Sequence, residues 1–174
     1  YPANFQLVAA MNPCPCGHFP DRSRCSCTPA QIRKYLGRIS GPLLDRIDIC
    51  VEAAPVSYDE IRVNKGGESS VSIRSRVERA RKLQARRFRG LGIRCNAEMT
   101  GAMIRRFCVL DTESERLLEE VYEKKGMSAR TYDRILKVAR TIADLENEER
   151  IRCSHLYEAL SFVSAKEQFW GRQE

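Results

Sequence analysis

The chain has 174 residues, 43% of them hydrophobic, which is enough for one ordinary domain or two small ones with a buried core. No run approaches the roughly 18 apolar residues that a membrane-spanning helix requires, and the sequence shows no secretory signal, so we expect a cytoplasmic protein without a membrane partner. The formal net charge is +7, which is typical of proteins that bind nucleic acid or other acidic partners.

The first segment, 5–10, is an unbroken apolar run that ends just before Asn12 and Pro13. Such a run predicts a strand that is covered on both faces, as in a parallel sheet. Because ligands of open α/β sheets bind at the carboxyl ends of the strands, the Asn12 amide would be placed to contact a nucleotide or to orient a water. Alternatively, Asn12 only caps the turn before the proline.

Two closely spaced cysteine pairs follow, Cys14 with Cys16 and Cys25 with Cys27. Four thiolates on two tight loops supply the tetrahedral donor set of Zn²⁺ and leave no open position for a substrate, so we expect a structural zinc site. The alternatives are two disulfides, free buried thiols or a redox pair, and disulfides would need an oxidising compartment. His18 could replace one of the cysteines, although it lies very close to Cys16 in the sequence.

Capping signals predict a helix over 28–37, and alternating apolar residues predict a second strand over 47–51. Arg46 lies at the junction of a short apolar turn and this strand. An arginine held there by rigid elements can reach a phosphate in a neighbouring molecule. The alternative is an ion pair with Asp45 or Asp48.

Much of the positive charge lies between Arg74 and Arg94, a segment with nine basic residues and one acid, Glu78. Apolar residues at helical spacing predict a helix over about 70–89 with one packed face and arginines elsewhere. Such a helix would bind the phosphates of DNA or RNA in a salt-dependent way. The candidate contacts are Arg79, Arg81, Lys82, Arg86, Arg87 and Arg89. Alternatively, the helix is only solvated, or its arginines pair with acids of a neighbouring subunit.

A polar connection at 64–70 predicts a linker, and the segments beyond the basic helix predict a small helical bundle. The central helix of that bundle begins after Ser128 and has a wide apolar face. Arg130 lies in its first turn, near N–H groups that favour anions. From the residues alone, the simpler expectation for Arg130 is an ion pair with an acid such as Glu123.

Three ordered segments resemble the ComM (YifB) family of magnesium-chelatase-like AAA+ ATPases: VAAMNPCPCG, CSCTPAQIRKYLGRISGPLLDRIDI and SARTYDRILKVARTIADLE. The resemblance implies a mostly α-helical fold with a small α/β part. Residues 1–56 would be the end of an AAA+ core, with a few parallel strands and the zinc loop. Residues 57–70 would be a linker, and 71–174 an all-helical lid domain.

The same resemblance implies roles for three side chains. Asn12 matches sensor 1, Arg46 matches the arginine finger and Arg130 matches sensor 2 of such ATPases. The chain contains neither the phosphate-binding loop G-x-x-x-x-G-K-[ST] nor an apolar strand ending in Asp-Glu for Mg²⁺. We therefore expect a carboxyl-terminal fragment that is inactive alone, within a longer protein whose remaining part binds ATP and Mg²⁺.

The family further implies a homohexameric ring that couples ATP hydrolysis to branch migration of DNA during natural transformation. The expected partners are single-stranded or branched DNA and the neighbouring subunits of the ring. Two alternatives stay open. One is a zinc-containing nucleic-acid-binding module without an ATPase role, and the other is a chelatase-type motor that acts on a protein partner.

Overall fold

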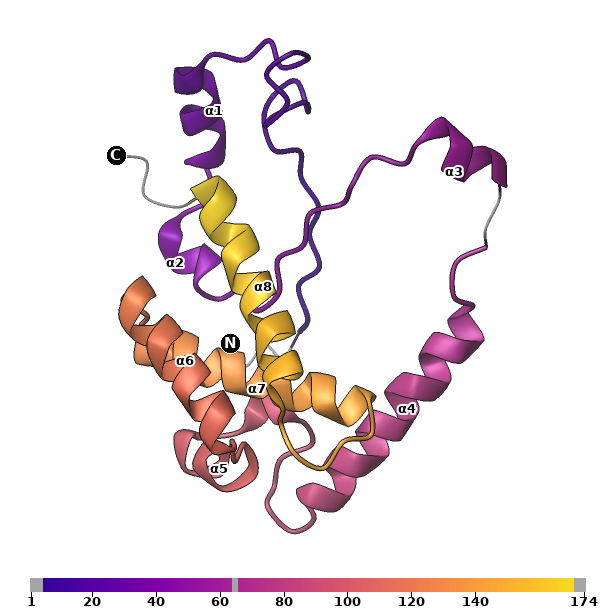
Figure 1. Ribbon diagram of the computed structural model, residues 1–174, viewed down its shortest axis with the longest axis vertical. Coiled ribbons are helices and arrows are strands. Elements are labelled where there is room, and N and C mark those ends of the chain that lie inside the picture. The colour runs from indigo at the N-terminus through magenta and orange to yellow at the C-terminus, as the bar shows by residue number, and fades with distance from the viewer. Residues whose placement is uncertain (1–4, 64–65, 171–174) are drawn as a thin grey trace. The chain divides into compact units, whose positions relative to one another are not determined.

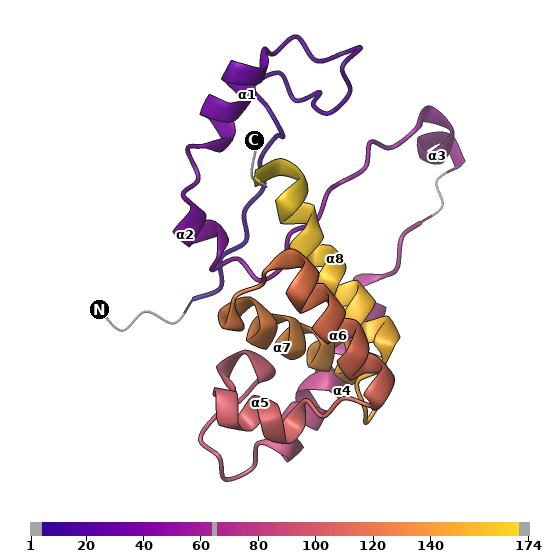
Figure 2. The ribbon, with the colours of Figure 1, turned by 60° about the vertical axis from the view of Figure 1, so that its left-hand side comes forward.

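The computed structural model describes residues 5–63 and 66–170 (Figures 1 and 2). The described part is mostly helical, as expected, and the chain divides into two units. The first unit holds Tyr1–Ile47 and Lys166–Glu174, and the second holds Asp48–Ala165. None of the described helices combines the length and the hydropathy needed to cross a membrane.

The expected domain limits, 1–56, 57–70 and 71–174, stay a prediction for the complete protein. Residues 64–65 of the expected linker lie outside the described residues. The short helix α3 (Tyr58–Val63) comes just before them.

The first unit contains a cysteine loop followed by α1 (Pro29–Leu36) and the short α2 (Gly41–Leu44). A complete capping box starts α1: the Thr28 hydroxyl accepts from the Gln31 N–H, and the Gln31 side chain accepts from the Thr28 N–H. This reciprocal pair satisfies two backbone donors that a helix start otherwise leaves open. The predicted helix is thereby confirmed, and it begins directly after the last cysteine of the loop.

The end of α8 (Cys153–Trp170) belongs to the same unit and closes its small core. The Trp170 indole N–H donates to the Leu36 carbonyl oxygen at 3.1 Å, which satisfies one of the carbonyls left open at the end of α1. The Phe169 ring meets the Phe19 ring edge-on, with centroids 6.4 Å apart. Residues at opposite ends of the sequence therefore build one cluster.

The two expected strands, at 5–10 and 47–51, do not form in the described part of the chain. Both segments are irregular, and Val8 and Val51 are 85% and 69% exposed. A strand depends on ladder hydrogen bonds to a neighbour, and within the described residues no backbone hydrogen bond joins 5–10 or 48–51 to another segment. The apolar pattern alone therefore did not produce a strand, because no segment of the described chain pairs with it.

The second unit is a helical bundle arranged around α7 (Figures 1 and 2). Besides α3, its elements before α8 are α4 (Ser70–Arg87), the 3₁₀ turn η1 (Asn96–Glu98), α5 (Gly101–Phe107), α6 (Thr112–Lys125) and α7 (Ala129–Leu145). Ile135 and Ala139 on α7 are at most 1% exposed and pack in one core with Leu118 of α6 and Leu156 of α8. Each aliphatic side chain of leucine size buried in this way contributes about 1.5–3 kcal/mol.

Both α6 and α7 begin with a side-chain cap, and the start predicted for α7 after Ser128 is confirmed. The Asp111 carboxylate accepts from the Ser114 N–H at 2.8 Å at the start of α6. Gly126 ends α6 in the left-handed conformation with φ of 57°, which glycine adopts at little steric cost. Two residues later, the Ser128 hydroxyl accepts from the Thr131 N–H and starts α7.

A buried carboxylate joins α4 to α7. The Asp144 side chain is fully buried and accepts hydrogen bonds from four side chains on three segments. Arg87 of α4 binds both of its oxygens, and Gln84 and Asn96 add amide donors at 3.2 and 2.8 Å. Arg140, one turn earlier on α7, completes the set. The carboxylate therefore fixes how α4 and η1 lie on α7.

Burial works to raise the pKa of Asp144, but the hydrogen bonds from Arg87 and Asn96 and the charges of the two arginines hold it below its ordinary value. Arg140 uses its remaining donors on the backbone, where its two terminal nitrogens reach the carbonyls of Glu148 and Glu149 at 2.6 and 2.7 Å. The network therefore also positions the turn that leads from α7 to α8.

We expect Asp144→Asn to lower the free energy of unfolding of the second unit by about 3–5 kcal/mol, because it leaves two buried guanidinium groups without a counter-charge. Urea unfolding followed by far-UV circular dichroism measures the loss. The matched control is Asp133→Asn, the same substitution on the same helix at a partly exposed position. Equal stability of the two variants would contradict the role given to Asp144.

The pH dependence has a defined sign. Since the folded-state pKa of Asp144 is depressed, its stabilisation is fully present above the unfolded pKa of about 3.8 and is lost as the pH falls through the folded value. The wild-type chain should therefore lose stability below about pH 4 more steeply than Asp144→Asn does.

Candidate functional site

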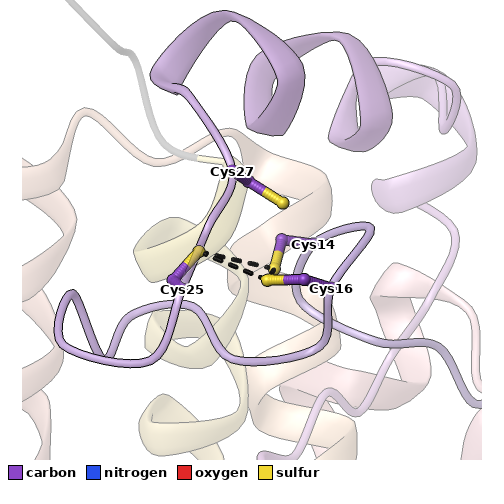
Figure 3. Close-up of side chains that lie close together, drawn as sticks. All are labelled: Cys14, Cys16, Cys25 and Cys27. Atoms are coloured by element: carbon purple, nitrogen blue, oxygen red, sulfur yellow. Dashed lines mark hydrogen bonds between the residues drawn. The ribbon is translucent and has the colours of Figure 1, made fainter.

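The four cysteine sulfurs converge on one point in the first unit (Figure 3). The Sγ atom of Cys14 lies 3.4 Å from that of Cys16 and 3.8 Å from that of Cys25, and Cys16 and Cys25 are 3.6 Å apart. With Cys27 included, all four atoms lie within 4.8 Å of one another. Four thiolates at about 2.3 Å from a tetrahedral Zn²⁺ are about 3.8 Å apart, so these distances fit a metal site.

Backbone geometry brings the two pairs together. The Gly17 N–H donates to the Cys14 carbonyl at 3.1 Å and closes a tight turn around the first pair, with Gly17 at φ of 83°, where a side chain would strain the backbone. The Cys25 N–H donates to the Asp21 carbonyl at 2.9 Å and brings the second pair back toward the first. Cys27 then leads directly into the cap of α1.

The loop also stabilises thiolate charge. The Phe19 N–H donates to the Cys14 sulfur at 3.4 Å. A hydrogen bond from the His18 backbone lowers the pKa of Cys16 to about 5, whereas burial raises the pKa of Cys27 to about 11. Backbone N–H donors of this kind favour the deprotonated sulfurs that metal binding requires.

The sulfur geometry excludes one of the alternatives left open by the sequence, the two disulfides. All four cysteines are free, and their sulfurs are much farther apart than the roughly 2.05 Å of a disulfide. Among the described residues, the metal-ligand group consists of the cysteines without His18. The four-cysteine cluster can therefore hold a metal ion such as zinc, with no ligand position left for catalysis.

Asn12 and Arg46 both lie in the first unit and are exposed. Asn12 precedes the cysteine turn, and its amide lies beside Gly17. Arg46 follows α2, and one of its terminal nitrogens donates to the Pro42 carbonyl at 2.7 Å. No described carboxylate pairs with Arg46, so most of its five N–H donors face solvent.

Arg130 is the second residue of α7 in the second unit and is exposed. The ion pair with Glu123 considered from the sequence does not form, and within the described part of the chain no other carboxylate pairs with Arg130. The Arg130 guanidinium therefore lies exposed at the start of a capped helix, and no ion pair with a described carboxylate occupies it.

The basic helix forms as α4, two residues shorter than predicted at its end. Of its candidate contacts, Arg81, Lys82, Arg86 and Arg89 are exposed, as is Arg79, which donates to the Ser75 hydroxyl at 2.9 Å. Arg87 differs, because its side chain is 17% exposed and its guanidinium is bound to Asp144. We therefore leave Arg87 out of the proposed phosphate surface.

Two structural features escaped the sequence reasoning. The Asp144 network was missed because Asp144 and Arg140 interrupt an apolar helix face only at a spacing of four, which reads equally well as an exposed pair. Phe169 and Trp170 were left without a role. The available signal was a pair of large aromatic residues near the end of a polar helix. Such residues are usually buried, so the pair indicated a packing contact.

Comparison with known proteins gives two family matches. Residues 67–163 match the family described as magnesium chelatase, subunit ChlI C-terminal, and residues 1–61 match magnesium chelatase, subunit ChlI. Protein YifB of Salmonella typhimurium is 44% identical over 164 residues, covering 93% of this chain and 31% of that protein. The competence protein ComM of Haemophilus influenzae is 42% identical over the same shares of the two chains. The chain therefore spans about a third of the length of the curated relatives it matches.

We predict about one Zn²⁺ per purified chain by metal analysis, and a change in tryptophan fluorescence when the metal is removed by a chelator. Trp170 is the only tryptophan of the chain and packs in the cluster that contains the four cysteines. Loss of the metal should expose the indole and shift its emission to longer wavelength.

The variant Cys25→Ser is expected to show the shifted emission without chelator, and Cys95→Ser, outside the cluster, should behave like wild type. A metal-free chain with wild-type emission would rule out this coupling.

Proposed function

Because the chain belongs to the magnesium chelatase ChlI family, we propose that it is part of an ATP-driven AAA+ motor of the ComM type that remodels DNA. The complete protein would act as a homohexameric ring in the cytoplasm, with ATP and Mg²⁺ held by the portion that this chain lacks. Its task would be branch migration of DNA during natural transformation. The observation that carries the proposal is that Arg46 and Arg130 are exposed and that no carboxylate of the described residues forms an ion pair with either of them.

The exposed apolar segments support this view. Phe5 and Val8 are 76% and 85% exposed, and Ile49 and Val51 are 53% and 69% exposed. Exposed apolar side chains within each of these two segments suggest that another part of the complete protein covers them. We propose that these segments are strands of the AAA+ core, whose neighbouring strands lie in the rest of the complete protein.

The residues would divide the work on the nucleotide. Asn12 at the end of its strand would orient the attacking water. Arg46 would reach the nucleotide of the adjacent subunit and stabilise the charge that develops on the transferred phosphoryl group. Arg130 would contact the γ-phosphate from the lid and so couple nucleotide state to the lid's position. The four cysteines would hold a structural Zn²⁺ that keeps the loop after Asn12 in place.

The arginine roles are tested by ATP turnover of the complete protein. Arg46→Ala should lower the rate about 10³-fold or more, and Arg130→Ala about 10²-fold. Arg116→Ala removes an exposed cation from α6 and should leave turnover unchanged. Wild-type turnover in Arg46→Ala would contradict the proposal.

Mixing two inactive variants distinguishes action within a subunit from action between subunits. A ring assembled from Asn12→Ala and Arg46→Ala subunits contains some interfaces with an intact Asn12 on one side and an intact Arg46 on the other. If Arg46 acts on its neighbour, turnover should recover at about a quarter of the interfaces of a random ring. No recovery would place Arg46 on its own subunit's nucleotide.

We further propose that the exposed cations of α4 bind DNA. The double variant Arg81→Ala/Lys82→Ala should reduce the slope of log affinity against log salt on single-stranded DNA by about 1.4, because each lost phosphate contact removes about 0.7. Arg116→Ala/Arg150→Ala removes the same charge from exposed positions outside α4 and serves as the control. An unchanged slope in the α4 variant would exclude this contact.

A further inference from the structure

A second group of positive charges lies in the first unit, whereas α4 belongs to the second. Residues 17–39 carry five cations and a single acid, Asp21. The five are Arg22, Arg24, Arg33, Lys34 and Arg38, named here the α1 surface. All five side chains are exposed. A small module with this excess of positive charge is expected to attract a negatively charged partner.

Within the described residues these cations have little compensation from acids, since only Asp21 lies near one of them, Arg24. Asp21 is engaged by Ser23, whose N–H and hydroxyl donate to one carboxylate oxygen at 2.9 and 2.6 Å. None of the five forms an ion pair with a carboxylate of the described chain. A divalent ion with four thiolates carries a formal charge of −2, which offsets only half of the segment's net charge of +4. The α1 surface therefore stays positive when the metal is bound.

The cysteine loop and α1 hold these charges in fixed places. Arg24 directly precedes the predicted ligand Cys25, and the Arg22 guanidinium lies over the Phe19 ring at 5.2 Å from its centroid. Arg33 and Lys34 lie in the last turn of α1, which is anchored by its buried side chains. Side chains held on an ordered cysteine loop and a capped helix lose less conformational entropy on binding than side chains on a flexible segment.

We propose that the α1 surface binds the sugar-phosphate backbone of single-stranded nucleic acid, as a contact separate from α4. Four of its five cations are arginines, whose planar groups bind phosphate oxygens with two parallel hydrogen bonds. The contact is therefore independent of sequence and sensitive to salt. This proposal rests on the DNA binding proposed above and adds a second contact, which lies in the first unit.

The test uses the 174-residue chain loaded with Zn²⁺ and a fluorescein-labelled oligothymidine, with binding measured by fluorescence anisotropy over a series of salt concentrations. Arg33→Ala/Lys34→Ala removes two contacts and should weaken binding about 25-fold near 0.1 M salt and reduce the salt slope by about 1.4. The control, Arg116→Ala/Arg150→Ala, has the same net charge and should retain both values within twofold.

A second variant protects the test against a folding defect, because Arg33 and Lys34 also stabilise the carboxyl end of α1. Arg24→Ala/Arg38→Ala lies outside that helix and should give the same loss, with wild-type zinc content and Trp170 emission as evidence of an intact unit. If Arg81→Ala/Lys82→Ala weakens binding and both α1-surface variants bind like the control, the α1 surface is excluded and the α4 contact stands. If no variant differs from the control, both proposals fail.

Discussion

One buried carboxylate governs the geometry of the helical unit. Asp144 collects two guanidinium groups and two amides, and each donor comes from a different position on α4, η1 or α7. Because a charge removed from water must find all of its partners, the three elements have few arrangements in which Asp144 is satisfied. Apolar packing alone would tolerate sliding of α4 along α7, whereas this network specifies the register.

The network also explains which arginines remain available to ligands. Arg87 and Arg140 are drawn inward by Asp144, and Arg140 is further tied to the carbonyls of Glu148 and Glu149. Within the part of the chain that the structure describes, no acid pairs with Arg46 or Arg130, and both stay at the surface. In a chain with 30 basic and 23 acidic residues, the placement of acids decides which cations are structural and which are free to bind phosphate.

Local signals predicted the helices well because their causes are local. Ser128 and Gly126 act within a turn of their own positions, and the capping box of Thr28 needs only Gln31. The cysteine cluster was predictable for the same reason, since tight spacing within each pair leaves little freedom. The strand expected over 5–10 has a different kind of cause, because its hydrogen bonds depend on a partner segment that the pattern cannot supply.

The contacts that escaped prediction join residues far apart in the sequence. Asp144 meets Arg87 across 57 positions, and Trp170 meets Leu36 across 134. Neither contact produces a periodic pattern in the sequence, because each depends on how the helices pack after they have formed.

The contact between Trp170 and Leu36 is important because the first unit, which holds the four cysteines, has a small core. Cys14, Ile32 and Leu36 are the buried members of that core within the described chain, too few to offset the entropy of ordering the loop. Two additions can make up the difference: a metal that cross-links the four thiolates, and the Phe169–Trp170 pair that covers them. The metal would cross-link residues within a short loop, whereas the Phe169–Trp170 pair joins residues near opposite ends of the chain. Closing the shorter loop costs less conformational entropy, so metal binding would be the easier first step. A metal-bound loop with α1 in place then offers the Leu36 carbonyl as a ready-made acceptor for Trp170, and the end of α8 docks on a surface that already exists.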